Sequence, residues 1–196
     1  MAPPLAGVSL CIKLYSDYYQ GEQTNMPGLL MFYVGGSAPG ANIELHDVQF
    51  AAADRPEEAY PLLREKWFGD KRKVHVDGYA RIDWADGYDV SLEPAPFAGE
   101  ERLFFVNVGG YRSDELAELH QFGLFVARSA DEAKEKAKRA LLTDSAQQHK
   151  DDLAEVDDCL LLQALQGYHV HLRANPHGNP ARPLWQGYLP IGEPAL

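Results

Sequence analysis

The sequence has few cysteines and no long apolar run. Only two of its 196 residues are cysteines, Cys11 and Cys159, and their wide separation excludes the paired spacing of zinc knuckles. No secretory signal is recognisable, so we expect free thiols in a reducing, cytoplasmic compartment. No apolar stretch approaches the length of a membrane span, so a transmembrane helix is not expected.

Basic residues are also scarce. The chain has 18 Lys and Arg against 29 Asp and Glu, a formal net charge of −11. Such a surface repels phosphate backbones and anionic lipids, so neither nucleic acid nor a membrane is an expected partner. A small molecule, another protein and a second copy of the chain remain open as partners. The 45% hydrophobic content is typical of a globular protein with a real core.

The clearest positive feature is an internal repeat. The stretch "IELHDVQFAAADRPEEAYPLLREKW" begins at Ile43, and a weaker copy, "AELHQFGLFVARSADEAKEKAKRAL", begins at Ala117. An offset of 74 residues gives 14 identities over positions 34–83 without a gap, so we infer a tandem duplication. About six extra residues in the second copy are assigned to "DCLLLQALQ", after which Tyr88 aligns with Tyr168.

Each copy predicts two apolar strands, a helix and two further strands. Capping boxes are expected at Asp54–Glu57 and Ser129–Glu132, and Pro61 is expected to kink or shorten the first helix. A single helix covers only one face of a four-stranded sheet, so the other face must pack elsewhere. The predicted fold is α+β, with two tandem ββαββ repeats packed as a pseudo-twofold pseudo-dimer.

The predicted boundaries follow the repeat, which spans 29–95 and 102–175. Residues 1–28 form an N-terminal extension, interpreted as disordered or as a mis-called start, with an added edge strand as the alternative. The tail 176–196 is a Pro-rich arm, expected to lie on the body without regular structure.

Several segments resemble a known bacterial family. They include "MFYVGGSAPGANIELHDVQF", "HVDGYARIDWADGYDVSL" and "ELHQFGLFVA". These segments are similar to the family known as domain of unknown function 1543, whose members carry one or two copies of such a unit. The resemblance covers about residues 30–173 and implies a tandem two-copy member. It implies no established activity or cofactor.

Polar residues open the second and third strands of each predicted unit. A right-handed crossover makes these two strands parallel, so their first residues lie at the same rim. Imidazoles and carboxylates together are suited to zinc or iron, or to acid–base chemistry. The candidate ligand-binding residues are Glu44, His46, His75 and Asp77, with Glu118, His120, His149 and Asp151 as their copies.

The strand alternation argues against one shared site. His46 lies on the same face as Phe50, whereas the apolar face of the third strand contains Ala80 and Ile82 rather than His75. On a regular pleat the two histidines therefore point to opposite sides of the sheet. The structural alternative is that each His and acid bonds a turn or the sister repeat.

The other candidate functional residues have simpler structural explanations. The Gly-Gly pairs at 35–36 and 109–110 are expected in hairpin turns rather than in an anion-binding nest. His169 and His171 share a face but are expected on a surface edge strand, and Cys159 is interpreted as a small apolar residue.

Three classes of function follow. The favoured one is a non-catalytic small-ligand or protein-interaction module, because both copies keep the polar set. The alternative is a metal-assisted or acid–base hydrolase that uses the same residues. The third is a structural subunit of a larger assembly. No particular substrate or cofactor is predicted.

Overall fold

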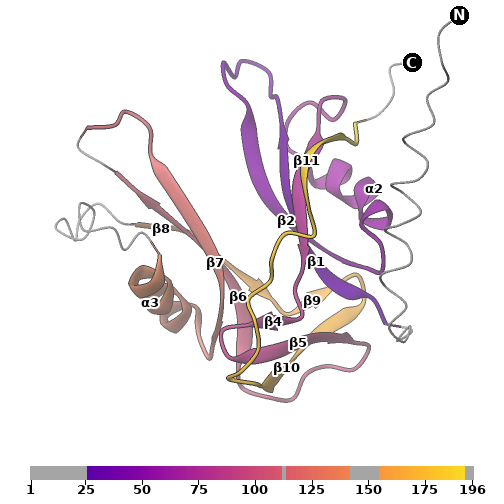
Figure 1. The fold of residues 1–196 in the computed structure, drawn as a ribbon, viewed down its shortest axis with the longest axis vertical. Coiled ribbons are helices and arrows are strands. Elements are labelled where there is room, and N and C mark those ends of the chain that lie inside the picture. The colour runs from indigo at the N-terminus through magenta and orange to yellow at the C-terminus, as the bar shows by residue number, and fades with distance from the viewer. Residues whose placement is uncertain (1–25, 112–113, 142–154, 193–196) are drawn as a thin grey trace, which may run out of the picture.

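The structure, a computed structural model, describes residues 26–111, 114–141 and 155–192. These residues form three antiparallel sheets and two helices, which confirms the prediction of an α+β protein. Two of the sheets diverge like the arms of a V, and the third lies at its base (Figure 1). Cys11 lies outside the described residues.

The first sheet is built around β1 (Gly28–Gly36). This strand pairs antiparallel with β2 (Leu45–Ala53) on one side and with β3 (His75–Arg81) on the other. Therefore β2 and β3 run parallel, as predicted, and both begin beside the end of β1. The strands in spatial order are β11 (Trp185–Pro190), β3 (His75–Arg81), β1 (Gly28–Gly36) and β2 (Leu45–Ala53).

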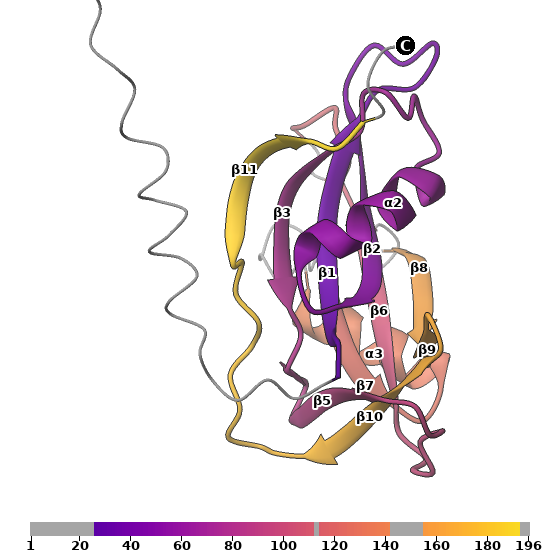
Figure 2. The same ribbon diagram turned by 90° about the vertical axis from the view of Figure 1, so that its right-hand side faces the viewer.

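The second copy builds a similar sheet around β6 (Arg102–Gly110), between β7 (Leu119–Ala127) and β8 (Glu155–Leu162). A helix lies on the outer face of each of these two sheets, α2 (Pro56–Lys66) on the first and α3 (Ala130–Ala140) on the second (Figures 1 and 2). Alanine and leucine side chains of each helix are buried against the sheet, as the apolar stripes predict.

The last predicted strand of each copy does not extend that copy's own sheet. A turn with positive φ follows β4 (Trp84–Ala85) in the first copy and β9 (Ala164–Leu165) in the second, and it reverses the chain. Strand β5 (Tyr88–Glu93) then pairs with β10 (Tyr168–Ala174), in the order β4-β5-β10-β9. The two copies thus share one sheet.

The shared sheet corrects the prediction for His169 and His171. Their strand, β10, lies between β5 and β9 and is not an edge strand. Nε2 of His171 lies 2.7 Å from the carbonyl oxygen of Ala95, and Nδ1 lies 3.4 Å from Glu93. Both ring nitrogens of His171 therefore already contact protein oxygen atoms.

The main core lies between the two copies. Leu29, Phe50 and Ile82 of the first copy pack with Leu103 and Phe105 of the second, above apolar residues of the shared sheet. The rings of Phe50 and Phe105 meet edge to face at 5.4 Å. Smaller clusters lie under α2 and α3. The inner faces of both sheets thus pack against each other near the shared sheet.

Of the two predicted capping boxes, the structure contains one. In α3 the Ser129 side chain accepts from the Glu132 amide at 3.2 Å, as the capping box requires. In α2 the residue before the helix is Arg55, which makes no side-chain cap. The predicted cap at Asp54 is wrong because the helix begins at Pro56, one residue later than assumed. Pro61 does not make α2 shorter than α3, since both have 11 residues.

The C-terminal arm is more regular than expected. It lies on the body, as predicted, but its residues 185–190 form β11, which pairs antiparallel with the outer edge of β3. The carbonyl oxygen of Ile191, a buried residue, accepts a hydrogen bond from Arg64 of α2 at 2.9 Å. Pro190 is tolerated because it ends an edge strand, where the missing N–H is not needed.

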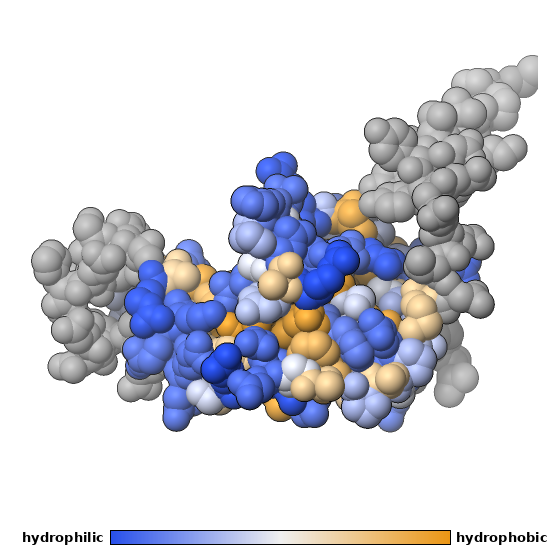
Figure 3. Space-filling model, turned by 90° about the horizontal axis from the view of Figure 1, so that it is seen from below, coloured by the Kyte–Doolittle hydropathy of each residue, from blue (hydrophilic) through white to orange (hydrophobic). Residues whose placement is uncertain are grey.

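One face of the molecule is largely polar. The face in Figure 3 is mostly hydrophilic, and its largest group of hydrophobic side chains lies near the centre. In the described part of the chain, neither helix has the length and apolarity needed to traverse a bilayer.

Candidate functional site

His46 and His75 lie on the same face of the first sheet. Gly35 in β1 is directly opposite His46 in β2 and His75 in β3. Residues that are directly opposite in an antiparallel ladder point to the same side, so both rings lie above Gly35. The prediction that the two histidines point to opposite sides is wrong.

A β-bulge explains the error. The register of β1 with β3 shifts at Asp77, which is an extra residue without a direct partner. Such a bulge reverses the alternation of the side chains that follow it. Ala80 and Ile82 follow the bulge and His75 precedes it. All three therefore lie on the same face of the sheet. The sequence argument assumed an unbroken pleat between them.

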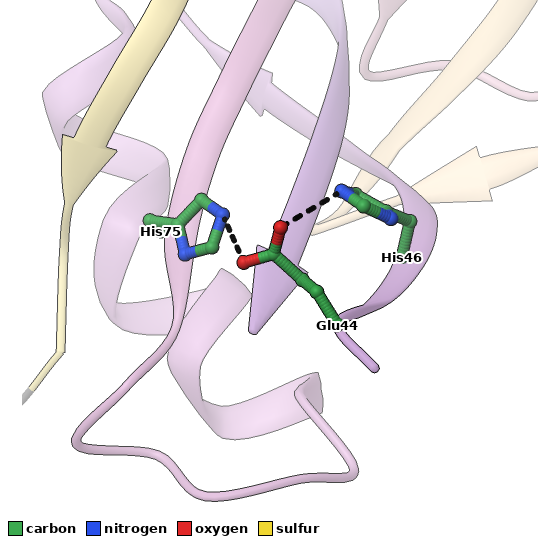
Figure 4. Close-up of side chains that lie close together, drawn as sticks. All are labelled: Glu44, His46 and His75. Atoms are coloured by element: carbon green, nitrogen blue, oxygen red, sulfur yellow. Dashed lines mark ion pairs between the residues drawn. The ribbon is translucent and has the colours of Figure 1, made fainter. Parts of the chain in front are cut away.

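Four side chains converge on the face of the sheet above Gly35. Nε2 of His75 lies 3.1 Å from Oε1 of Glu44 and 3.2 Å from Oδ1 of Asp77. Nε2 of His46 lies 3.1 Å from Oδ2 of Asp77 and 3.7 Å from Oε2 of Glu44. Figure 4 shows the Glu44 carboxylate between the two imidazoles. We call Glu44, His46, His75 and Asp77 the donor cluster.

The other ring nitrogen of His75, Nδ1, lies 3.4 Å from the carbonyl oxygen of Lys73, which can only accept. The tautomer that carries its proton on Nδ1 is the one that can donate a weak hydrogen bond there. In a neutral ring Nε2 then presents a lone pair to the two carboxylates. Nε2 of His75 and Oδ2 of Asp77 are both buried, and neither makes a hydrogen bond of acceptable geometry. A cation between these atoms, a proton or a metal ion, removes the repulsion.

Burial of the donor cluster is graded. The His75 side chain is only 2% exposed, whereas that of Glu44 is 49% exposed. Aromatic rings flank the histidines: Tyr33 stacks on His46 with ring centroids 5.0 Å apart, and Tyr188 of β11 lies 4.3 Å from His75. Burial and, second, the charge of Asp77 raise the pKa of the Tyr33 phenol. Its hydroxyl is therefore neutral near physiological pH.

The spacing of the donor atoms fits a metal ion. Zinc binds imidazole and carboxylate at about 2.0–2.2 Å, so neighbouring ligand atoms of a tetrahedral site are about 3.3–3.6 Å apart. The four contacts in the donor cluster range from 3.1 to 3.7 Å. One donor atom from each of Glu44, His46 and His75 lies within 4.8 Å of the other two. The Nδ1 contact of His75 with a backbone carbonyl is the usual second interaction of a ligating histidine.

A pocket of about 390 Å³ opens beside the donor cluster. Glu44 and His75 belong to its wall, together with Arg72, Lys73 and Tyr188. The guanidinium of Arg72 is already paired with Asp70 through two contacts of about 3 Å. A small molecule in this pocket would therefore lie beside two residues of the donor cluster, Glu44 and His75.

The second copy differs from the first at the third strand. Nε2 of His120 lies 3.5 Å from Oε2 of Glu118, which resembles the contact between His46 and Glu44 in the first copy. His149 and Asp151 lie outside the described residues. Gly109, the counterpart of Gly35, pairs with Glu155 where Gly35 pairs with His75.

The sheet pairing therefore matches the third strands at an offset of 80 residues rather than 74. The six extra residues lie between α3 and β8, not within "DCLLLQALQ" as the repeat alignment assumed. By position in the sheet, the counterparts of His75 and Asp77 are Glu155 and Asp157, rather than His149 and Asp151. The two copies do not keep the same polar set, which removes the sequence argument for a non-catalytic role.

Three contributors to the site were not recognised from the sequence. Gly35 was assigned to a turn, but it lies within β1, and a Cβ there would be 2.5 Å from Nε2 of His75. Tyr33 was detectable because it precedes Gly35 by two residues and so shares its face. Tyr188 had no such signal, because its position depends on the pairing of β11 with β3.

A solved structure shares the fold. The crystal structure of the protein Il1583 from Idiomarina loihiensis matches with a TM-score of 0.65 and 34% sequence identity. The match covers 85% of this chain and 99% of that one. The comparison with curated proteins found no match.

A family model matches the chain in two segments, residues 41–92 and 115–172, which together make up more than half of it. The segments coincide with the two copies of the repeat, as a tandem two-copy member requires. The chain belongs to the family described as Domain of Unknown Function (DUF1543).

Proposed function

We propose that the protein is a small-ligand-binding module whose first copy binds a divalent transition-metal ion. The observation that carries the proposal is the convergence of Glu44, His46, His75 and Asp77, with four nitrogen-to-oxygen contacts of 3.1–3.7 Å. The buried, unbonded Nε2 of His75 supports a cation at the centre, because its lone pair faces two carboxylates.

The donor types narrow the choice of ion. Imidazole nitrogen favours zinc, iron, cobalt or nickel over magnesium and calcium, which prefer oxygen alone. Thiolates are absent from the cluster, which disfavours copper(I). Zinc and cobalt(II) are therefore the appropriate probes.

The test is calorimetric titration of ZnCl₂ into protein purified without a histidine tag and stripped with a chelator. We expect one strong site per chain, and we expect His46→Ala and His75→Ala each to weaken zinc binding by at least 100-fold. Elemental analysis of untreated protein provides an independent measure of the resident ion.

The matched control is His120→Ala, the counterpart of His46→Ala in the second copy. It should leave the strong site intact. If wild-type protein binds no zinc, cobalt or manganese, or if His120→Ala removes the site, the proposal is wrong. A melting temperature lowered by His75→Ala in protein that binds no metal would identify the donor cluster as a structural ion-pair network.

We also infer that the two copies are ββαββ units related by a pseudo-twofold axis through the shared sheet. Reciprocal hydrogen bonds support it: Val126 N donates to Oδ2 of Asp86 at 2.9 Å, and Ala52 N donates to Oε1 of Gln166 at 2.6 Å. Asp86 and Gln166 are equivalent turn residues, both with positive φ. An antiparallel pairing with matched cross-contacts is the isologous arrangement of a twofold dimer.

A metal-assisted hydrolase that uses the same donor cluster remains the alternative, and a chromogenic ester or phosphoester assay of zinc-loaded protein tests it. A cytoplasmic location, and a small molecule or protein as partner, also remain proposals from the sequence.

A further inference from the structure

We propose that the pocket beside the donor cluster binds a small oxyanion, with one oxygen on the metal ion and another on the Lys73 ammonium. The inference rests on the proposed metal site and adds the chemical class of its ligand. Its basis is the position of Glu44 and His75, which belong to both the donor cluster and the pocket wall.

The pocket has room and an appropriate lining. Its volume of about 390 Å³ accommodates a small molecule. Lys73 and Arg72 belong to its lining and are positively charged, and Tyr188 contributes an aromatic ring from β11. Arg72 is paired with Asp70 at 3.0 Å, whereas Lys73 acts on the Asp70 carboxyl only through its charge. Lys73 is therefore the cation that is available to a ligand.

The local charge makes oxyanion binding depend on the metal. The two carboxylates of the donor cluster carry a formal charge of −2, which outweighs the single positive charge of Lys73. A divalent ion neutralises the carboxylates and leaves the pocket with a net positive charge. The chain as a whole carries −11, so its overall field does not attract anions. Binding of an oxyanion thus requires the specific site.

An open coordination position is compatible with the geometry. Glu44 lies just before β2 at the pocket side, and its side chain is half exposed, unlike that of His75. Glu44, His46 and His75 each offer one donor atom within 4.8 Å of the other two. Three protein donors leave the fourth position of a tetrahedral zinc ion open to a ligand.

The experiment uses full-length protein loaded with cobalt(II), whose visible absorption reports on coordination. Cobalt is titrated first, and inorganic phosphate or acetate is then added in parallel samples. We expect either oxyanion to change the spectrum saturably, and phosphate binding to be undetectable by calorimetry without metal. We expect Lys73→Met to weaken binding at least tenfold without changing cobalt affinity. The two anions distinguish a phosphate ligand from a carboxylate ligand.

Lys71→Met is the control, because Nζ of Lys71 is bonded to the Glu65 carbonyl and does not belong to the pocket wall. Cobalt binding without any response to phosphate or acetate overturns this inference and leaves the metal proposal standing. Equal loss in Lys71→Met and Lys73→Met also overturns it, since surface charge alone then explains the effect. Failure to bind cobalt refutes the metal site before any anion is added.

Discussion

Oε1 of Glu44 lies 3.1 Å from Nε2 of His75, a ring nitrogen buried inside the first sheet. Glu44 lies just before β2 and His75 begins β3, and these strands do not pair with each other, since β1 lies between them. Their meeting requires a residue with no side chain in β1 and an extra residue in β3. Gly35 and the bulge at Asp77 supply these two conditions.

Gly35→Ala should disrupt the donor cluster without removing any ligand atom. The new Cβ would lie 2.5 Å from Nε2 of His75 and 2.8 Å from Oδ2 of Asp77, so the donors must move apart. We expect zinc affinity to fall by roughly 100-fold, the upper range for changes that displace ligating groups. Isothermal titration calorimetry measures the change.

The matched control for this variant is Gly123→Ala in β7. A Cβ there meets the ring of Phe125 at 3.1 Å, far from the donor cluster in sequence and in a different sheet. It should cost some stability and leave zinc affinity unchanged. Wild-type zinc affinity in Gly35→Ala would show that the metal binds elsewhere.

Zinc should stabilise the folded protein. An ion present at about 100 times its Kd adds about 2.7 kcal/mol to the free energy of unfolding, which corresponds to roughly 5–10 °C in Tm for a chain of this length. Differential scanning calorimetry with and without ZnCl₂ measures the shift. His75→Ala should show no shift, and His171→Ala, whose ring contacts Ala95, should keep it. A full shift in His75→Ala contradicts the assignment.

The contact between Phe50 and Phe105 should couple the two copies energetically. Phe105→Ala is expected to lower the free energy of unfolding by about 3–5 kcal/mol, because its ring is buried between the sheets. A double-mutant cycle with Phe50→Ala should give a coupling of about 0.5–1.5 kcal/mol. Urea denaturation provides the values, and Leu116→Ala, which is fully exposed, should change them by less than about 0.5 kcal/mol. Two separate unfolding transitions would contradict a common core.

The Asp89 carboxyl should make the folding stability depend on pH in the acidic range. A hydrogen bond from Asn175 and, second, one from Arg173 lower the pKa of its carboxyl below the ordinary value. The folded-state pKa is thus below the unfolded one, so the stabilisation is complete above about pH 4 and disappears as the pH falls through the folded value. Asp89→Asn should melt at a lower temperature than wild type at neutral pH, and the two melting temperatures should converge as the pH falls below the unfolded-state pKa of about 4. A difference that is constant with pH excludes this carboxylate as its source.

The sequence was sufficient to predict two strands, a helix and a third strand in each copy. It also predicted that Glu44 and His46 lie at the same end of the sheet as His75 and Asp77. These features depend on local pattern and on the parallel relation of β2 and β3. The face of the sheet toward which His75 points was not predictable, because a bulge is defined by hydrogen bonds between strands distant in sequence. One extra residue at Asp77 is enough to reverse the assignment.

The place of the six-residue insertion was ambiguous for a different reason. The segment "DDLAEVDD" repeats its carboxylates, so Asp77 aligns with Asp151 at one offset and with Asp157 at the other. Sequence identity favours the first offset, whereas the pairing of Glu155 in β8 with Gly109 selects the second. The position of β11 was equally hidden, because nothing in a Pro-rich tail specifies which strand edge it will join.

Strand β11, which brings Tyr188 over the ring of His75, is the last described strand in the order of synthesis. A ribosome adding about 5–20 residues per second needs roughly 5–20 s to proceed from β3 to β11. Throughout that interval the outer edge of β3 lacks β11, and Tyr188 has not yet been made. The proposed metal ion would therefore meet His75 before the Tyr188 ring lies against it.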